Sequence, residues 1–416
     1  MCKAVLLSLL LYFFTYFNAN AQRGGCPDPF AENYHLLNQG SCEDCQYKKI
    51  DIPREAIGRM PDEVKETSGL LSFDGQLWTI NDSGNGPFLF QLDETGEKVI
   101  RKVRVNGAKN KDWEELTQDK THIYIGDFGN NEGSRDKLVI YVIEKKELIH
   151  DTVQAERIKF SYPEQKDFNH RNRAHNFDCE AMVCIRDTLH LFTKNWTNRW
   201  TKHYILPNKP GKFSAKFIDS FNIQMLVTGA CWIPSSNALA LIGYTIPNNA
   251  AVWIFRNINT KNIFAGPRRK IDLGSMADAG QVEAVAANSN YEMELFFSNE
   301  DFKGLIAPHL QRVDINSLIN SFPTGGISAP DVNDVNIAPN QLGGYLNVEL
   351  IMRHNDSVFI QVYNRGGQLI GMPMPCEAKR GYNQFKLPMS ENTVPGEYLV
   401  LIFNEDRKIA GMKFTW

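Results

Sequence analysis

The sequence predicts an all-β protein in which a five-bladed β-propeller is followed by a small C-terminal β-sandwich. Three observations lead to this class. An acidic or polar strand start recurs five times in the middle of the chain, antiparallel strands follow each start, and short alternating strands fill the last part. Four antiparallel strands repeated about every 40–50 residues are typical of propeller blades. We therefore expect two different all-β folds in one chain.

The N-terminal segment reads as a secretory signal peptide, residues 1–21. An apolar run from Ala4 to Phe17 follows Lys3, and Ala19 and Ala21 supply the small residues that precede a cleavage site. The run is short for a helix that crosses a bilayer, which needs about 20 apolar residues, so a retained anchor is the alternative. We expect a mature protein that is secreted or on the outer cell surface, without a transmembrane segment.

The charge balance and the length limit the classes of function. The chain of 416 residues has 45 Lys and Arg against 48 Asp and Glu, a net charge of −3. A weakly acidic chain has no electrostatic reason to bind nucleic acid, so nucleic acid is excluded as a partner. The length exceeds a single ordinary core and predicts more than one domain.

Residues 22–47 form a small cysteine-containing module. In an oxidising compartment Cys26 and Cys42 are expected to form a disulfide, with Cys45 as an extra thiol. A zinc site that adds His35 to the three cysteines is the alternative. The segment GCPDPFAENYHLLNQGSC resembles a module of secreted Bacteroidota proteins. The matching residues are Gly25, Cys26, Asp28, Pro29, Ala31, Asn33, Tyr34, Gly40, Ser41 and Cys42.

Residues 48–321 contain the repeat. The five starts are ETSGL from Glu66, DWEEL from Asp112, DCEAM from Asp178, TGACW from Thr228 and QVEAV from Gln281. Each start is followed by a second strand that ends in polar residues and then by a third strand. Four repeats add a fourth strand, and KKIDIP at residues 48–53 is expected to complete the last blade and close the ring. Six blades, with one hidden between Glu114 and Glu180, are the alternative.

The repeat predicts a ring of side chains at one mouth of the central channel. The first strand of each propeller blade lines the channel, so distant residues meet there. The expected ring is Ser68, Glu114, Glu180, Ala230 and Glu283, and Glu66, Asp112 and Asp178 lie two residues earlier on the same strand faces. The same alignment places Cys179 and Cys231 on neighbouring inner strands, where they are candidates for a disulfide.

Crowded carboxylates need neutralisation, because each raises the pKa of the others. Three roles stay open: a Ca²⁺ or Mg²⁺ site, structural hydrogen bonding, and catalysis. The candidate metal ligands are Glu114, Glu180 and Glu283, and the candidate catalytic residues are the same three with His175. The candidate ligand-binding residues are Glu66, Ser68, Asp112, Glu114, Asp127, Asp178, Glu180, Lys194 and Glu283.

The middle part also resembles a group of largely uncharacterised secreted bacterial propeller proteins. The motifs that carry the resemblance are Ser68-Gly69-Leu70, Asn81-Asp82-Ser83-Gly84, Asp112-Trp113-Glu114, Gly126-Asp127-Phe128-Gly129-Asn130-Asn131, Glu180-Ala181, Thr193-Lys194 and Gln281-Val282-Glu283-Ala284. The resemblance implies a secreted propeller, six-bladed in some members, and no settled activity.

The last part, residues 322–416, predicts a β-sandwich of seven short strands. It resembles the C-terminal sorting domain of type IX secretion substrates. The matching residues are Tyr363, Asn364, Gly367, Gln368, Gly381, Asn383, Leu387, Gly396, Glu397, Tyr398, Val400, Lys413 and Phe414. The resemblance implies that residues 330–416 engage the type IX secretion machinery. An ordinary adhesion-type sandwich is the alternative.

Two functions follow from these elements. The first is a secreted or cell-surface propeller that binds a small molecule, a glycan or a divalent ion at the channel mouth. The second is a secreted metal-assisted hydrolase, an esterase, phosphatase or glycosidase, that uses the same carboxylates. Whether the protein is an enzyme stays open at this level.

Overall fold

The computed structural model describes residues 45–47, 50–245, 249–256, 258, 260–321, 332–341, 343–352, 355–366, 368–390, 393–404 and 407–416. The predicted signal peptide and the predicted Cys26–Cys42 bond lie outside these residues. Cys45, expected as an extra thiol, is disulfide-bonded. In the part of the chain that the structure describes, no helix is long and apolar enough to cross a membrane.

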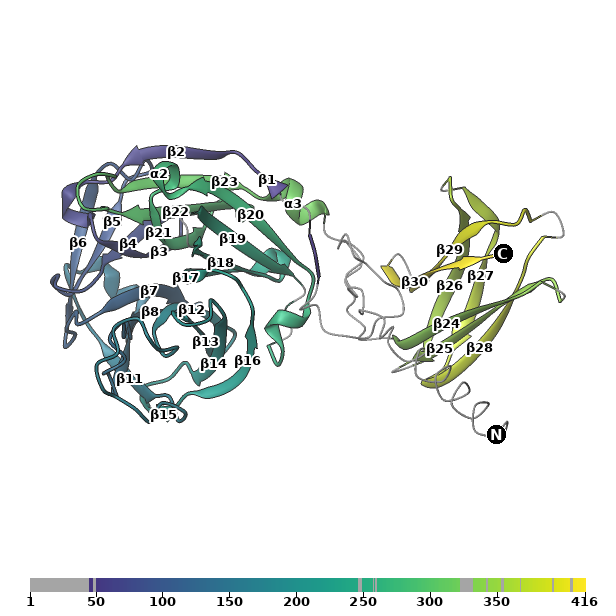
Figure 1. Cartoon of the computed structure of the whole chain (residues 1–416), viewed down its shortest axis with the longest axis horizontal. Coiled ribbons are helices and arrows are strands. Elements are labelled where there is room, and N and C mark those ends of the chain that lie inside the picture. Colours follow the sequence, from purple (N-terminus) through teal and green to yellow (C-terminus); the bar gives the residue numbers. More distant parts are fainter. Residues whose placement is uncertain are drawn as a thin grey trace, which may run out of the picture. The chain divides into compact units, whose positions relative to one another are not determined.

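Five mainly antiparallel sheets, three of which have a parallel strand at the outer edge, follow one another around a central channel in the first part of the described chain (Figure 1). Blade 1 contains β3 (Thr67–Phe73), β4 (Gln76–Asn81), β5 (Phe88–Leu92), β6 (Val99–Asn106) and β10 (Thr152–Gln154). Blade 2 contains β7 (Trp113–Gln118), β8 (His122–Asp127), β9 (Leu138–Glu144), β11 (Glu156–Ser161) and β15 (Gly211–Ser214). Blade 3 contains β12 (Cys179–Ile185), β13 (Thr188–Thr193), β14 (Thr201–Pro207) and β16 (Lys216–Phe221).

The two remaining blades close the ring. Blade 4 contains β17 (Leu226–Ile233), β18 (Ala238–Thr245), β19 (Asn249–Arg256), β20 (Arg268–Ser275) and β1 (Ile50–Asp51). Blade 5 contains β21 (Gln281–Ala287), β22 (Glu294–Glu300), β23 (His309–Asp314) and β2 (Arg54–Arg59). Each inner strand contacts the inner strand of the next blade, and β21 contacts β3. The predicted five-bladed propeller is confirmed.

Short helical turns connect some of these strands. They are η2 (Asp62–Val64), η3 (Lys145–Ile149), η4 (Pro234–Ser236), η5 (Ile263–Ala265), α2 (Met276–Ala279) and α3 (Asn316–Ser321). The residues between Glu114 and Glu180 contain no hidden sixth blade. They form β8, β9 and β11 of blade 2, and β10 pairs in parallel with β6 at the outer edge of blade 1.

One sequence prediction about ring closure is wrong. The segment KKIDIP does not complete the last blade, because its strand β1 pairs in parallel with β20 at the outer edge of blade 4. The next strand, β2, pairs antiparallel with β23 and is the outer strand of blade 5. The strand Arg54–Arg59 was missed because it faces solvent at the edge of its sheet. Its apolar and polar residues therefore alternate too weakly to indicate a strand.

The core of the propeller lies between the blades. Inner strands are buried on both faces, so β12 reads CEAMVCI without an exposed residue, whereas β6 alternates because it lies further out. A separate buried cluster fills each contact between neighbouring blades. The cluster between blades 1 and 2, for example, holds Trp78 and Trp113. Each buried aromatic or aliphatic side chain stabilises this packing by about 1.5–3 kcal/mol.

The last described part is a two-layer β-sandwich. One sheet contains β24 (Val332–Asn340), β25 (Tyr345–Met352) and β28 (Gly381–Pro388). The other contains β26 (Asp356–Asn364), β27 (Leu369–Ala378), β29 (Glu397–Asn404) and β30 (Arg407–Thr415). Side chains of both sheets, such as Val348 and Val400, share one buried cluster. The predicted sandwich is therefore confirmed.

Candidate functional site

A β-bulge interrupts every inner strand of the propeller at its beginning. A bulge leaves one extra residue outside the ladder and re-aims its side chain. The residues that the register shifts leave unpaired are Ser68, Glu114, Glu180, Thr228 and Glu283. Five bulges at the same level of a closed ring bring these side chains to one mouth of the channel.

Two of the bulge residues carry hydroxyl groups that join neighbouring blades. The Ser68 hydroxyl can donate a hydrogen bond to either of two carbonyl oxygens, that of Trp113 at 2.8 Å and that of Glu114 at 2.9 Å. The Thr228 hydroxyl donates to the Val282 carbonyl at 2.8 Å. The Trp113 and Val282 carbonyl groups occupy equivalent positions, since each belongs to the residue just before the bulge residue of the next blade. These two positions are structural links in the ring.

Ala230, which was expected in the ring, belongs elsewhere. Its amide donates a hydrogen bond of 2.7 Å to Glu115 Oε2, and it lines the cavity at the opposite mouth. Thr228 occupies the expected ring position instead. Residues two positions apart on a strand point to the same face of the sheet but lie about 6.6–6.8 Å apart along the strand. The aligned start TGACW was therefore out of register with the other repeats.

The three glutamates of the ring line a cavity of about 510 Å³. Ligand sites of small molecules usually occupy about 300–1,000 Å³. Other residues that line this cavity include Ser68, Asp82, Asn131, Arg173, Lys194, Trp196, Tyr244, Gln281 and Glu300. The cavity therefore combines several carboxyl groups with two basic side chains and an aromatic wall. Its acidic end is the candidate functional site.

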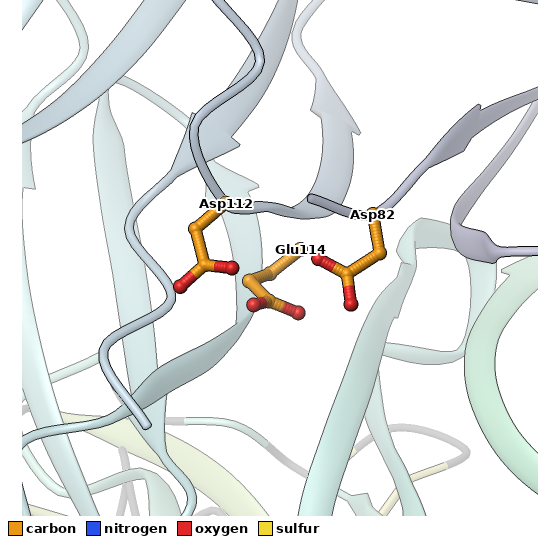
Figure 2. A group of neighbouring side chains, drawn as sticks. All are labelled: Asp82, Asp112 and Glu114. Atoms are coloured by element: carbon orange, nitrogen blue, oxygen red, sulfur yellow. The ribbon is translucent and has the colours of Figure 1, made fainter. Parts of the chain in front are cut away.

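Asp82, Asp112 and Glu114 form a three-carboxylate cluster at the side of this cavity. One carboxylate oxygen of each residue lies within 4.8 Å of the others. Figure 2 shows the Glu114 carboxyl group between those of Asp82 and Asp112. Gly129 makes room for the cluster, because a Cβ atom there would overlap Glu114 Oε1 and lie 2.6 Å from Asp112 Oδ2.

Burial and mutual repulsion raise the pKa of every carboxyl group in the cluster. Burial is the larger cause for each, and the neighbouring acids add to it. The pKa of Asp112 rises to about 7, although Arg135 Nη1 at 3.7 Å opposes the rise. Glu114 is 5% exposed, and its main influences, burial and the neighbouring acids, all raise its pKa. Basic side chains therefore oppose the rise in pKa at Asp112 and Asp82, through Arg135 and Lys194, but none is among the main influences on Glu114.

Two predicted site residues, Asp127 and Asp178, are buried supports and do not line the cavity. Asp127 Oδ1 lies 2.8 Å from Arg135 Nη2, so it fixes the guanidinium that approaches Asp112. Asp178 accepts hydrogen bonds from the Asn130 amide at 2.6 Å and from Trp196 Nε1 at 2.8 Å. Asp178 thereby holds the indole ring that lines the cavity.

Glu180 and Lys194 form a buried ion pair on another side of the cavity. Lys194 Nζ lies 3.2 Å from Glu180 Oε2, and the two side chains are 6% and 3% exposed. Burial lowers the pKa of Lys194, but Glu180 and its neighbouring acids outweigh this and raise it well above its usual value. Lys194 therefore stays charged and neutralises the Glu180 side of the cavity.

Glu283 and Glu300 share one amide donor. Gln281 Nε2 donates to Glu283 Oε1 at 2.6 Å and also to Glu300 Oε1. Burial is the largest cause that raises the pKa of Glu283 to about 7 and that of Glu300 to about 9. At neutral pH Glu300 is therefore mainly protonated, and this wall can donate as well as accept hydrogen bonds.

Glu66 and His175 lie outside the cavity lining. The Glu66 carbonyl oxygen accepts a hydrogen bond of 2.8 Å from the Asp82 amide nitrogen, so Glu66 positions the backbone of Asp82 in the cluster. His175 Nε2 lies 3.1 Å from the Asn131 carbonyl oxygen, and its Nδ1 accepts the Phe177 amide at 3.2 Å. This half-buried histidine holds a loop, and the geometry gives no support to its predicted catalytic role.

Sequence reasoning missed Asp82, Glu300 and Tyr244 as members of the site. Asp82 directly follows the second strand of blade 1, and Glu300 ends that of blade 5. Because second strands run antiparallel to inner strands, they end at the mouth where the inner strands begin. The polar ends of those strands were therefore a usable signal.

Comparisons with known proteins add little to this geometry. No family model matches the chain, and no curated protein matches it. An exo-β-1,3-galactanase from Phanerochaete chrysosporium is 9% identical with a TM-score of 0.41, covering 87% of this chain and 100% of its own. The β-propeller domain of Cps50 (Swd1) from Myceliophteria thermophila is 9% identical to this chain with a TM-score of 0.33. The match covers 63% of this chain and 99% of that domain.

A bifunctional GH43-CE protein from Bacteroides eggerthii is 12% identical with a TM-score of 0.35, covering 86% of this chain and 58% of its own. At these values no residue role passes from those proteins to this chain. The strand pairing and the site define the class: an all-β protein with a five-bladed propeller whose channel has one acidic mouth.

Proposed function

We propose that the propeller is a secreted or cell-surface protein that binds a divalent cation, Ca²⁺ or Mg²⁺, and holds a ligand through it. The observation that carries the proposal is the cluster of Asp82, Asp112 and Glu114, whose carboxylate oxygens approach within 4.8 Å. This group shares only Glu114 with the metal ligands expected from the sequence. It differs because the second strand and the inner strand of adjacent blades meet at the same mouth.

A hard cation suits this cluster better than another role does. Like charges that are buried together destabilise a fold unless something positive lies among them. Arg135 is 3.7 Å from Asp112, but Glu114 has burial and acidic neighbours as its main influences. Carboxylate oxygens are the preferred ligands of Ca²⁺ and Mg²⁺. A bound cation would remove the repulsion and lower the pKa of all three groups.

The cluster would leave part of the cation accessible. Ca²⁺ takes about 6–8 oxygen ligands, and three carboxylates supply about 3–6. Asp82 and Glu114 line the cavity, so the remaining positions face that space. Oxygen atoms of a ligand in the cavity can fill them. The cation therefore connects the acidic cluster to ligand binding.

Thermal melting and calorimetric titration with Ca²⁺ and Mg²⁺ test the cation site. A ligand that binds only the folded state stabilises it by about 2.7 kcal/mol at a concentration 100 times its Kd. We expect melting temperature to rise with cation concentration and to fall with EDTA. Asp82→Asn and Glu114→Gln are expected to remove the response, and Asp187→Asn, at the opposite mouth, to keep it. An unchanged melting temperature and no heat of binding would contradict the proposal.

We also propose that residues 330–416 direct export through type IX secretion machinery. The supporting observations are the sequence resemblance and the sandwich of residues 332–415. Deletion of residues 330–416 is expected to retain the propeller inside the cell envelope, whereas the full chain reaches the surface or the medium. Export of the truncated chain at the level of the full chain would exclude this role.

A further inference from the structure

The Glu180 side chain has an unused hydrogen-bond acceptor. Glu180 is 2% exposed, and its Oε2 is paired with Lys194. Its Oε1 is buried, and no described residue donates a hydrogen bond to it. A buried carboxylate oxygen without a donor is costly. Because Glu180 lines the 510 Å³ cavity, a donor on a bound molecule can satisfy this atom.

Lys194 provides a donor next to this acceptor. Its ammonium group has three N–H bonds and is paired with one Glu180 oxygen. Its Nζ also lies 5.1 Å from the centre of the Trp196 ring and 5.5 Å from that of Tyr244. Donor capacity therefore remains on the buried side of the cavity. A ligand at this position meets an acceptor and a donor on adjacent side chains.

The opposite charges of the Glu180–Lys194 pair favour a neutral group beside it. A cationic group at this position would approach the buried Lys194 ammonium, and an anionic group would approach the carboxyl groups of Glu180 and Glu283. A hydroxyl group is both a donor and an acceptor and carries no charge. Neighbouring hydroxyl groups therefore match the Glu180–Lys194 pair better than an amine or a carboxylate does.

The lining of the cavity also includes apolar side chains. They are Leu226, Tyr244, Met276, Phe302 and Ile306. Such side chains can cover the C–H face of a ring, while carboxyl and amide groups of the same lining bind its hydroxyl groups. Sites that bind small molecules combine an apolar surface with a few placed polar groups in this way.

We infer that the ligand is a neutral carbohydrate whose adjacent hydroxyl groups bind between Glu180 and Lys194 and complete the coordination of the cation. This inference rests on the cation site proposed above. Hydroxyl oxygens are suitable ligands for a hard cation, so the same sugar ring can contact the metal and the Glu180–Lys194 pair. In this arrangement the three-carboxylate cluster binds the cation, and the Glu180–Lys194 pair selects the sugar.

The test is titration of the full mature chain with a panel of neutral sugars in the presence of Ca²⁺. The probes are glucose, galactose, mannose, xylose and arabinose and β-linked disaccharides of each, followed by ligand-observed NMR. We expect saturable binding of at least one sugar, and loss of that binding in EDTA. Glu180→Gln and Lys194→Met are each expected to weaken it at least tenfold, and Asp187→Asn to leave it unchanged.

The outcomes separate this inference from the cation proposal. If Ca²⁺ shifts the melting temperature but no sugar of the panel binds, the carbohydrate inference is overturned and the cation site stands. Saturable binding of spermidine without any sugar binding also overturns it. If Ca²⁺ has no effect, the cation proposal itself fails. Lys194→Met serves as the second variant should Glu180→Gln not fold, and melting curves of both establish folding.

Discussion

Glu115 joins blade 2 to blade 4 across the channel, because its Oε2 accepts a hydrogen bond of 2.7 Å from the Ala230 amide. Its Oε1 accepts the Leu116 amide at 2.9 Å. Glu115 is fully buried and lines neither the acidic cavity nor the cavity of about 790 Å³ at the opposite mouth. Its sequence neighbour Glu114 faces the acidic cavity and Leu116 faces the other one. The carboxyl group thus occupies the interior of the channel between the two mouths.

Glu115→Gln is expected to destabilise the propeller. The carboxyl group receives backbone hydrogen bonds from Leu116, Met182 and Ala230, so an amide NH₂ group would face an N–H donor. A buried donor left unsatisfied costs about 1–3 kcal/mol. Urea denaturation should show a loss of this size, with Asp187→Asn as the surface control. Equal stability of Glu115→Gln and wild type would exclude this role.

Thr228→Val is expected to cost about 1 kcal/mol, because it removes the hydroxyl that donates to the Val282 carbonyl but keeps the shape of the side chain. Thr228→Ser is the matched control, since it keeps the hydroxyl. Chemical denaturation of the two variants tests the link between blades 4 and 5. If the serine variant loses as much stability as the valine variant, the hydrogen bond is not the cause.

His190 is expected to make the propeller less stable in acid. His190 Nδ1 lies 2.8 Å from His203 Nε2, and His203 Nδ1 lies 2.7 Å from Asp219 Oδ1. Burial, with a contribution from His203, lowers the pKa of His190 to about 3 from its ordinary value near 6.5. The unfolded chain therefore binds a proton that the folded chain does not between these two pH values.

The stability contributed by neutral His190 is complete above about pH 6.5 and is lost as pH falls toward about 3, at up to about 1.4 kcal/mol per pH unit. The measurement is the free energy of unfolding in urea from pH 7.5 to pH 4.5. His190→Gln, which does not titrate, should show a shallower slope by about this amount. Parallel slopes for the two proteins would show that another group causes the acid sensitivity.

Gly129→Ala is expected to weaken Ca²⁺ binding at least tenfold. A Cβ atom at this position would overlap Glu114 Oε1 and lie 2.6 Å from Asp112 Oδ2, so the carboxyl groups would move apart. Gly396→Ala in the sandwich is the matched control, because its Cβ would meet no atom closer than 4.0 Å. Calorimetric titration of both variants with Ca²⁺ gives the comparison. Undiminished affinity in Gly129→Ala would place the cation elsewhere.

The fold was predictable from the sequence because each blade repeats the same burial pattern. Inner strands are buried on both faces and begin with a polar bulge residue, so five similar segments appear in order. An N-terminal strand was expected to complete the last blade, but its residues were placed wrongly, at 48–53. Arg54–Arg59 is the strand that pairs with His309–Asp314, and no local pattern records a contact over that separation.

The site was predictable only in part. Glu114, Glu180 and Glu283 were found because bulge residues fall at the same place in DWEEL, DCEAM and QVEAV. In the fourth repeat the bulge is at Thr228, two residues before the expected Ala230, because TGACW lacks the acid that anchored the other alignments. Asp82 required knowledge of which strand ends share a mouth, which depends on tertiary structure.

The closure of blade 5 governs the order in which the protein can be completed. Arg54 Nη1 donates to Gln311 Oε1 at 2.7 Å across 257 residues of chain, and β2 is the outer strand beside β23. A ribosome makes β2 early and β23 late, so β2 has no partner until almost the whole propeller has been synthesised. The Glu283 and Glu300 side of the acidic mouth therefore forms only after blade 5 has been synthesised, whereas Asp82, Asp112 and Glu114 belong to blades 1 and 2, which are made earlier.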